Sequence, residues 1–87
     1  MYVIIVYDIS TQRVSKICQF LRQYLNWVQN SVFEGELTES ELKKIEDEIK
    51  HIIDINEDSV IIYKLRTDKI LEKKHIGIKK SDQSFII

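Results

Sequence analysis

The chain has 87 residues, of which 44% are hydrophobic and 31% are charged, so it fits one small globular domain and excludes a disordered chain. It contains one cysteine and no proline, which excludes an internal disulfide and favours a reducing compartment. Its formal net charge is −1, and no apolar run approaches the ~18 residues of a membrane span. The first residues also lack the basic segment of a signal peptide. We therefore expect a cytoplasmic protein with no membrane partner.

The charge is unevenly distributed along the chain. Residues 1–33 carry a net charge of +2, residues 34–58 carry −7 and residues 59–87 carry +4. Basic surfaces attract phosphates, so the two ends could face nucleic acid while the middle points elsewhere. Ordinary solvated faces are the alternative explanation.

The first half of the chain predicts a strand, a helix and a further extended segment. Residues 2–8 (YVIIVYD) combine β-branched and aromatic side chains, which is typical of a strand. An amphipathic helix is expected to begin near Ser10 or Thr11. Residues 26–37 are extended in character, as one strand or as two short strands that bend near residues 29–30. The apolar stripe of the helix consists of Val14, Ile17, Cys18, Leu21, Tyr24 and Leu25.

The second half predicts another helix and another strand. Thr38 and Glu41 have the spacing of a capping box, so a helix is expected over residues 38–53. Residues 59–65 (SVIIYKL) predict a strand, and residues 67–75 read as a charged connection. The segments HIGIK and QSFII are short strand candidates on either side of the polar turn KKSD.

This order of elements, with the middle segment taken as a hairpin, predicts a ferredoxin-like βαββαβ plait of the α/β (α+β) class with an extra C-terminal strand. The domain would span residues 1–80, and residues 81–87 would form the extra strand. Both helices must then cover one face of the sheet. Strands 2–8 and 59–65 are apolar on both sides, however, and such strands are normally covered on both faces. We therefore expect a homodimer packed sheet to sheet, with residues 84–87 on the partner protomer.

Asp8 ends the most hydrophobic strand and lies on the same side as Tyr2, Ile4 and Val6. If that side meets its copy across a two-fold axis, two Asp8 carboxylates approach each other and favour a bridging cation. Mg²⁺ suits such a site because it prefers oxygen ligands. The alternative is that Asp8 simply ends the strand or caps the helix.

Three stretches of the sequence, taken together, form a specific combination of motifs. They are YVIIVYDIS with an arginine soon after it, VQNSVFEGELTESEL, and EDSVIIYKL. They resemble the small CRISPR-associated endonuclease family of the spacer-acquisition module, over residues 1 to 65. The resemblance implies a ferredoxin-like homodimer in which Asp8 is the catalytic residue and metal ligand. The metal would be Mg²⁺, with Mn²⁺ as an alternative.

The resemblance also implies two roles. In the first, the protein is a metal-dependent endonuclease that acts on single-stranded RNA or double-stranded DNA. In the second, it is a non-catalytic, DNA-binding dimer that bridges two dimers of the CRISPR integrase during spacer integration.

Four residues are candidates for contact with nucleic acid. Arg13 would occupy the third position of the first helix and could clamp a phosphate, or could simply be solvated. Ser10 could contact a phosphate or only cap the helix. Ser31 and Phe33 lie in the SVF motif, where Phe33 could stack on a base or belong to the core. His51 and His75 lack a ligand at metal-binding spacing and are interpreted as surface residues.

Overall fold

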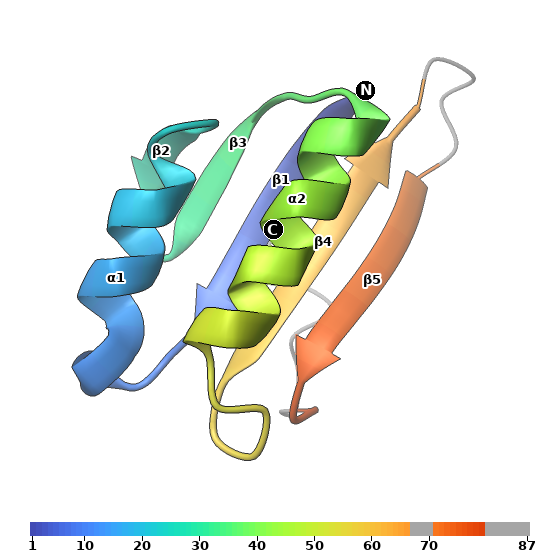
Figure 1. The fold of residues 1–87 in the computed structure, drawn as a ribbon. Coiled ribbons are helices and arrows are strands. Elements are labelled where there is room, and N and C mark those ends of the chain that lie inside the picture. Colours follow the sequence, from blue (N-terminus) through green and yellow to red (C-terminus); the bar gives the residue numbers. More distant parts are fainter. Residues whose placement is uncertain (67–70, 80–87) are drawn as a thin grey trace.

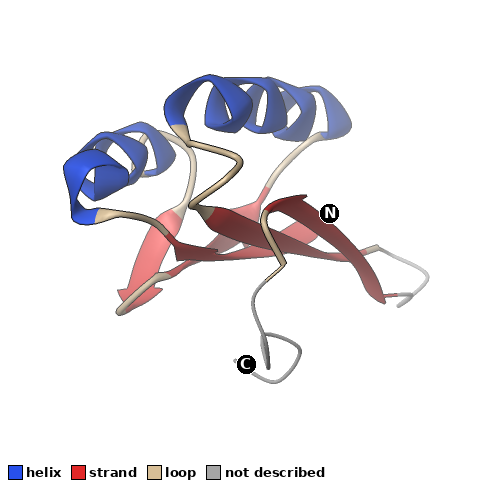
Figure 2. Ribbon diagram, turned by 90° about the horizontal axis from the view of Figure 1, so that it is seen from below, coloured by secondary structure: helices blue, strands red, loops and turns tan. Residues whose placement is uncertain are grey.

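The computed structural model describes residues 1–66 and 71–79, which form one antiparallel sheet of five strands and two helices on one face of it (Figures 1 and 2). In chain order the elements are β1 (Tyr2–Asp8), α1 (Thr11–Leu21), β2 (Asn26–Gln29), β3 (Val32–Glu36), α2 (Glu39–Ile52), β4 (Ser59–Leu65) and β5 (Leu71–Gly77). The bounds of β1 and β4 are those predicted.

The strand order is β2-β3-β1-β4-β5, so β1 lies between β3 and β4. The first four strands have the order of a ferredoxin-like plait, and β5 is added beside β4. The predicted ferredoxin-like fold is therefore confirmed, and its fifth strand lies before residues 81–87, where the extra strand was predicted. Both helices cover the same face, as Figure 2 shows.

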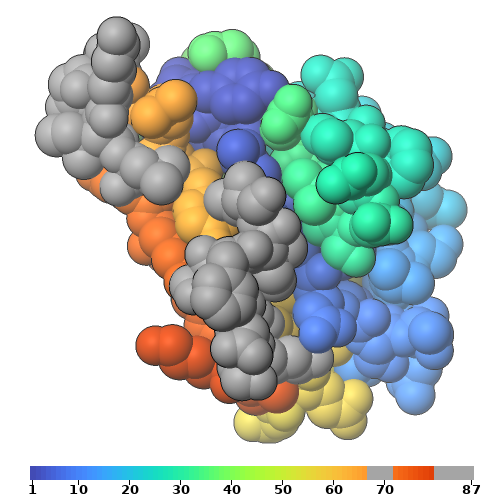
Figure 3. All heavy atoms as spheres, turned by 180° about the vertical axis from the view of Figure 1, so that it is seen from behind, coloured from blue at the N-terminus to red at the C-terminus, as the bar shows by residue number. Residues whose placement is uncertain are grey.

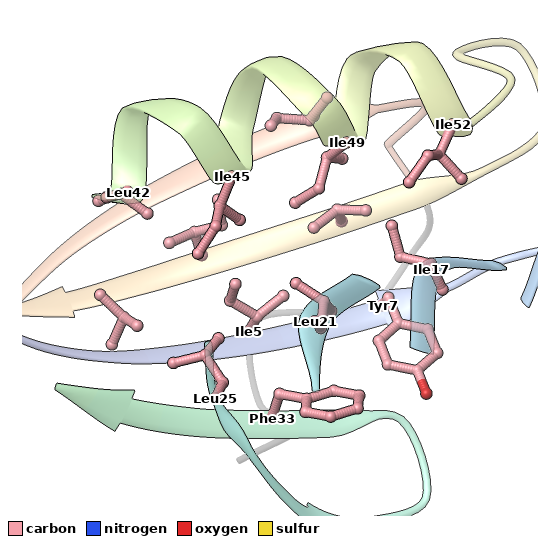
Figure 4. Packing of buried hydrophobic residues seen from close by; sticks show 14 of the residues in the cluster. Ile5, Tyr7, Ile17, Leu21, Leu25, Phe33, Leu42, Ile45, Ile49 and Ile52 are labelled. Atoms are coloured by element: carbon pink, nitrogen blue, oxygen red, sulfur yellow. The ribbon is translucent and has the colours of Figure 1, made fainter. Parts of the chain in front are cut away.

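The main core lies between the helices and the sheet (Figure 4). The alternation of a β-strand sends every second side chain of β1 to this face, where Ile5 is fully buried. Apolar stripes of the two helices pack onto it at helical spacing. The helix residues labelled in Figure 4 are Ile17, Leu21, Leu42, Ile45, Ile49 and Ile52.

A second apolar cluster lies on the opposite side of the sheet, which we call the far face. It consists of the buried residues Val6, Ile61 and Tyr63, with Ile4 and Val32 packed against them. The register pairs Val6 with Ile61 and Ile4 with Tyr63, so the cluster runs across β1 and β4. Figure 3 views the molecule from this side. The predicted two-faced apolar character of both strands is therefore confirmed.

Both helices begin at the predicted caps. Ser10 is the N-cap of α1, and Thr38 forms a complete capping box with Glu41 at the start of α2. Helix α1 ends at Leu21 and not at the predicted apolar residue Leu25. The N–H of Leu25 still donates to the carbonyl oxygen of Leu21 at 2.9 Å, and its side chain joins the core through this turn.

The segment of residues 26–37 forms two strands, β2 and β3, joined by a turn at residues 30–31. Asn30 adopts a φ of 43°, a left-handed conformation that asparagine tolerates better than most residues. This outcome confirms the hairpin alternative. The register between the strands shifts between Trp27 and Gln29, as at a β-bulge.

The interpretation of residues 67–75 as a connection is wrong for its second half, because Leu71–Gly77 forms β5. Two of its charged side chains form ion pairs with residues of other segments: Lys74 with Glu46 at 2.8 Å and Glu72 with Arg66 at 3.1 Å. The predicted strand at residues 83–87 and the boundary between residues 80 and 81 lie outside the described residues. Within residues 1–66 and 71–79, no helix is long and apolar enough to cross a membrane.

Candidate metal and nucleic-acid site at the end of β1

Asp8 is the last residue of β1 and its side chain is exposed. Its Cα is paired with that of Ser59, the first residue of β4. Strand alternation places Asp8 on the same side as Ile4 and Val6, beside the apolar cluster of the far face. A carboxylate therefore stands at one end of the strand that lies between β3 and β4.

The donor set at this position is compatible with a magnesium ion, and a second copy of the chain would add a second carboxylate. The described part of the chain contains no group of three histidine, cysteine or acidic residues that could hold a metal. Asp8 thus offers one carboxylate per chain. Mg²⁺ commonly keeps several waters and binds through one or two carboxylates together with phosphate oxygens. Two Asp8 carboxylates would meet that requirement.

Ser10 lies two residues beyond Asp8, in the loop between β1 and α1. Its hydroxyl accepts a hydrogen bond from the N–H of Gln12 at 3.4 Å, so the predicted capping role is confirmed. Its own N–H donates to Oδ1 of Asp58 at 3.0 Å. The loop that follows Asp8 is thereby tied to the segment that precedes β4.

Arg13 is paired with acids and is not a freely solvated side chain. Its Nε donates to Oδ2 of Asp58 at 2.6 Å, and its Nη2 donates to Oδ1 of Asp58 at 3.2 Å and to Oε1 of Glu57 at 3.0 Å. The Arg13 side chain is 21% exposed. The cation that would oppose the dipole of α1 is therefore neutralised by a carboxylate at the same place. Phosphate binding by Arg13 stays a prediction.

Asp58 bonds to several segments at this end of the sheet. It is fully buried, and besides Ser10 and Arg13 it accepts a hydrogen bond from the N–H of Asp54 at 2.9 Å. Burial alone raises the pKa of a carboxyl group, but the bonds from Arg13 and from the N–H groups of Asp54 and Ser10 lower the pKa of Asp58 to about 2. Its carbonyl oxygen also accepts from the N–H of Ile78 at 3.0 Å.

Ser31 and Phe33 differ in their access to a ligand. Ser31 is half-buried in the turn between β2 and β3, and its carbonyl oxygen accepts from the N–H of Tyr7 at 3.0 Å. This turn therefore lies beside the end of β1 that carries Asp8. Phe33 is fully buried and stacks on Tyr7 with ring centroids 6.1 Å apart. The core alternative for Phe33 is thus confirmed, and contact of Phe33 with nucleic acid stays a prediction.

Asp58 and the hydrogen-bonded pair of Ser59 and His75 were not predicted from the sequence. Ser59 is buried, and its Oγ shares a hydrogen bond of 2.9 Å with Nε2 of His75, which is half-buried on β5. His75 is thus not the plain surface residue that was expected. One signal could have pointed to Asp58: an acid stands directly before the second two-faced apolar run, just as Asp8 ends the first.

The chain matches the family model described as CRISPR associated protein Cas2 over residues 1–73. Two relatives named CRISPR-associated endoribonuclease Cas2, from Pyrococcus furiosus and Methanosarcina acetivorans, are 52% and 51% identical over 87 residues, with both chains fully covered in each comparison. A crystal structure of Streptococcus pyogenes Cas2 is similar with a TM-score of 0.71 and 32% identity, over 78% of this chain and 89% of the other. Another crystal structure of a Cas2 has a TM-score of 0.70 and 49% identity, over 72% of this chain and 71% of the other. With its fold and its length both matched by these proteins, the chain belongs to the CRISPR-associated Cas2 family.

Proposed function

We propose that this chain is a metal-dependent endonuclease of the CRISPR spacer-acquisition module, working in the cytoplasm. It hydrolyses phosphodiester bonds in single-stranded RNA, in double-stranded DNA, or in both. The observation that carries the proposal is the exposed carboxylate of Asp8 at the end of β1. Membership of a family whose relatives are named endoribonucleases supports it.

The proposed catalytic role of Asp8 is to hold Mg²⁺ or Mn²⁺ together with Asp8 of a second copy. When bound, the metal supplies an activated water and neutralises charge on the phosphate. The contribution of the chain is to keep the carboxylate in place. Hydrogen-bonded strands on both sides of β1 support that function, because they restrain its backbone.

A homodimer is part of this proposal. The apolar cluster on the far face, next to Asp8, supports packing of this face against a second copy. A two-fold axis parallel to β1 would bring the two Asp8 residues to the same end of the interface. Residues 84–87, which lie outside the described residues, are proposed to pack on the partner.

Nucleic acid would be bound around the same end of β1. Ser10 at the N-terminus of α1 and Ser31 in the β2–β3 turn both lie close to Asp8 along the backbone or across the sheet. Arg13 adds a cation whose Nε and Nη2 already bond to Asp58, so a phosphate contact would use the remaining edge of the guanidinium.

The second candidate function is a non-catalytic scaffold that grips duplex DNA and bridges two dimers of the CRISPR integrase. One observation favours it. In the described residues Asp8 belongs to no group of three potential metal ligands, which is a thin donor set for a nuclease.

Cleavage assays with labelled single-stranded RNA and duplex DNA test the proposal. Wild-type protein should cut at least one substrate with Mg²⁺ or Mn²⁺ and lose activity in EDTA. Asp8→Asn should abolish cleavage, because an amide binds a hard cation weakly. Asp47→Asn on α2, another exposed acid, should cut like the wild type. Duplex binding without cleavage in all three proteins would favour the scaffold and contradict the nuclease.

A further inference from the structure

Two segments flank Asp8, the start of β4 across the sheet and the loop after β1 along the chain. Both are connected to Asp58. Across the sheet, Asp8 is paired with Ser59, which directly follows Asp58 in the chain. Along the chain, Ser10 follows Asp8 by two residues and donates its N–H to the Asp58 carboxylate at 3.0 Å. The end of β1 and the loop after it are therefore fixed to the start of β4.

Asp58 is also hydrogen-bonded to two further segments around it. Its Oδ2 accepts from the N–H of Asp54 in the turn after α2, and its carbonyl oxygen accepts from the N–H of Ile78 after β5. Gly77 lets β5 pass close by: its φ is +103°, and a Cβ at this position would lie 2.0 Å from the carbonyl oxygen of Asp58. One buried residue thus joins α1, the α2–β4 turn and the end of β5.

We propose that Asp58 is the positioning residue for the Asp8 carboxylate and that Arg13 serves mainly as the counter-ion of Asp58. This inference rests on the proposed metal site at Asp8. It assigns Arg13 a role in metal binding that does not depend on the phosphate contact proposed above.

The physical reason lies in the exposure of Asp8. Asp8 lies at the end of a strand and is followed by a loop, so the contacts that anchor this loop contribute to the position of the carboxylate. Metal ligands must be kept within a fraction of an ångström, and groups behind the ligands commonly change metal affinity by about 10–100-fold when they are removed. Asp58 provides that support from behind, through the N–H of Ser10 and through Ser59.

Arg13 is needed because Asp58 is fully buried. A buried carboxylate without a counter-ion is strongly disfavoured, and the parallel bonds from Nε and Nη2 provide both charge and direction. Glu57 lies on the outer side of the same guanidinium and its side chain is 62% exposed. Among the described residues, the Glu57 side chain bonds to Arg13 and to neither Ser10 nor Asp58, so Glu57 provides a matched control.

The two roles of Arg13 predict different results. As a phosphate clamp, Arg13 would contribute to nucleic-acid affinity and leave metal affinity unchanged. As the counter-ion of Asp58, it contributes to metal affinity even when no nucleic acid is present. Metal titration of the free protein therefore separates the roles.

The experiment measures Mg²⁺ affinity by calorimetry, and Mn²⁺ affinity by paramagnetic resonance, on the full chain without nucleic acid. Asp8→Asn should abolish binding, and Asp58→Asn should weaken it by about 10-fold or more. Arg13→Lys, which keeps the charge and loses the forked geometry, should weaken it in the same direction. Glu57→Gln should stay within about 2-fold of the wild type, because a group outside this support should not change metal affinity.

Circular dichroism shows which variants are folded at the titration temperature. Ile49→Val, on the buried side of α2, is the control for stability. It should lower Tm and leave metal affinity unchanged. If Asp58→Asn does not fold, Arg13→Lys decides the question alone.

If Asp58→Asn is folded and binds metal like the wild type, the inference is overturned. If Asp58→Asn is unfolded, wild-type metal affinity in Arg13→Lys overturns it instead. In both cases, loss of binding in Asp8→Asn would still support the metal site. Unchanged affinity in Asp8→Asn would instead overturn the proposed function, and the inference with it. A loss of affinity in Ile49→Val equal to that in Asp58→Asn would show that the effect is one of general stability, which also overturns the inference.

Discussion

The Nε of Arg13 donates to Oδ2 of Asp58 at 2.6 Å, although 45 residues separate the two in the chain. This bond joins the first turn of α1 to the residue before β4. The backbone of Ser10 adds a second link between the same segments at 3.0 Å. One buried carboxylate therefore links these two segments at the end of the sheet that carries Asp8.

The stability of the protein should fall in acid because of Asp58. The pKa of Asp58 is about 2 in the folded protein, whereas an aspartate in an unfolded chain has a pKa of about 3.9. The depressed pKa stabilises the fold above about pH 4, and this stabilisation is lost as the pH falls from about 4 toward 2. Its size is on the order of 2 kcal/mol.

Urea unfolding at pH 6 and pH 3 measures this effect. Asp58→Asn should be much less stable than the wild type at pH 6, and the difference in the free energy of unfolding should narrow at pH 3. Glu57→Gln, which leaves the buried carboxylate in place, should show the wild-type acid dependence. A difference between wild type and Asp58→Asn that is the same at both pH values would contradict the prediction.

Gly77→Ala should destabilise the fold by more than about 1 kcal/mol. The backbone φ of +103° is unfavourable for alanine, and its Cβ would meet the carbonyl oxygen of Asp58. Gly35→Ala is the control, because the nearest atom to its Cβ is Cδ2 of Leu25 at 3.1 Å, the end of a side chain that can shift. Thermal unfolding of the two variants compares them, and a smaller loss of Tm for Gly77→Ala would count against the close approach.

The fold was predictable where local patterns and tertiary contacts agree. The β-branched runs of β1 and β4 gave correct bounds, and the capping box at Thr38 marked the start of α2. The end of β5 lies in the predicted strand candidate HIGIK, but its first four residues, LEKK, were missed because they are mostly charged. This segment forms a strand because β4 provides hydrogen-bond partners, and because Lys74 reaches Glu46, which lies 28 residues earlier.

The site was predictable only in part, because some of its contacts join residues that are remote in sequence. Asp8 was conspicuous because it ends an apolar run. Arg13 was conspicuous as a cation in the first turn of a helix, but its partner Asp58 is remote in sequence, so local reasoning suggested a phosphate. Phe33 shows a different case: its motif left a base contact and a core position open, and the pleat of β3 directs its ring into the core.

The protein should be a dimer at micromolar concentration. Light scattering should give a mass near twice 10.4 kDa, since a face of roughly 800 Å² per chain is enough for a stable interface. Ile4→Glu places a charge among the apolar side chains of the far face and should shift the mass toward the monomer. Val28→Glu, at an exposed position of β2, should not.

Removal of residues 84–87 should also weaken this dimer, because a strand added to the partner would be lost. A monomeric mass for the wild type would contradict the proposed interface. An unchanged dimer after the deletion would contradict only the role of the tail.

Metal should strengthen the dimer if Asp8 from each copy binds the same ion. A ligand that binds only the assembled state stabilises it by mass action, by about 2.7 kcal/mol when its concentration is 100 times its Kd. Dimer dissociation measured by sedimentation should therefore be suppressed by Mg²⁺ in the wild type.

The variants separate this shared site from other effects of the ion. In EDTA the two Asp8 carboxylates repel each other, so the Asp8→Asn dimer should dissociate as readily as the wild-type dimer or less readily. The Asp8→Asn dimer should also be insensitive to Mg²⁺, whereas Asp47→Asn on α2 should respond like the wild type. Equal effects of Mg²⁺ on wild type and Asp8→Asn would show that the ion acts elsewhere on the protein, and the shared site at the end of β1 would have to be abandoned.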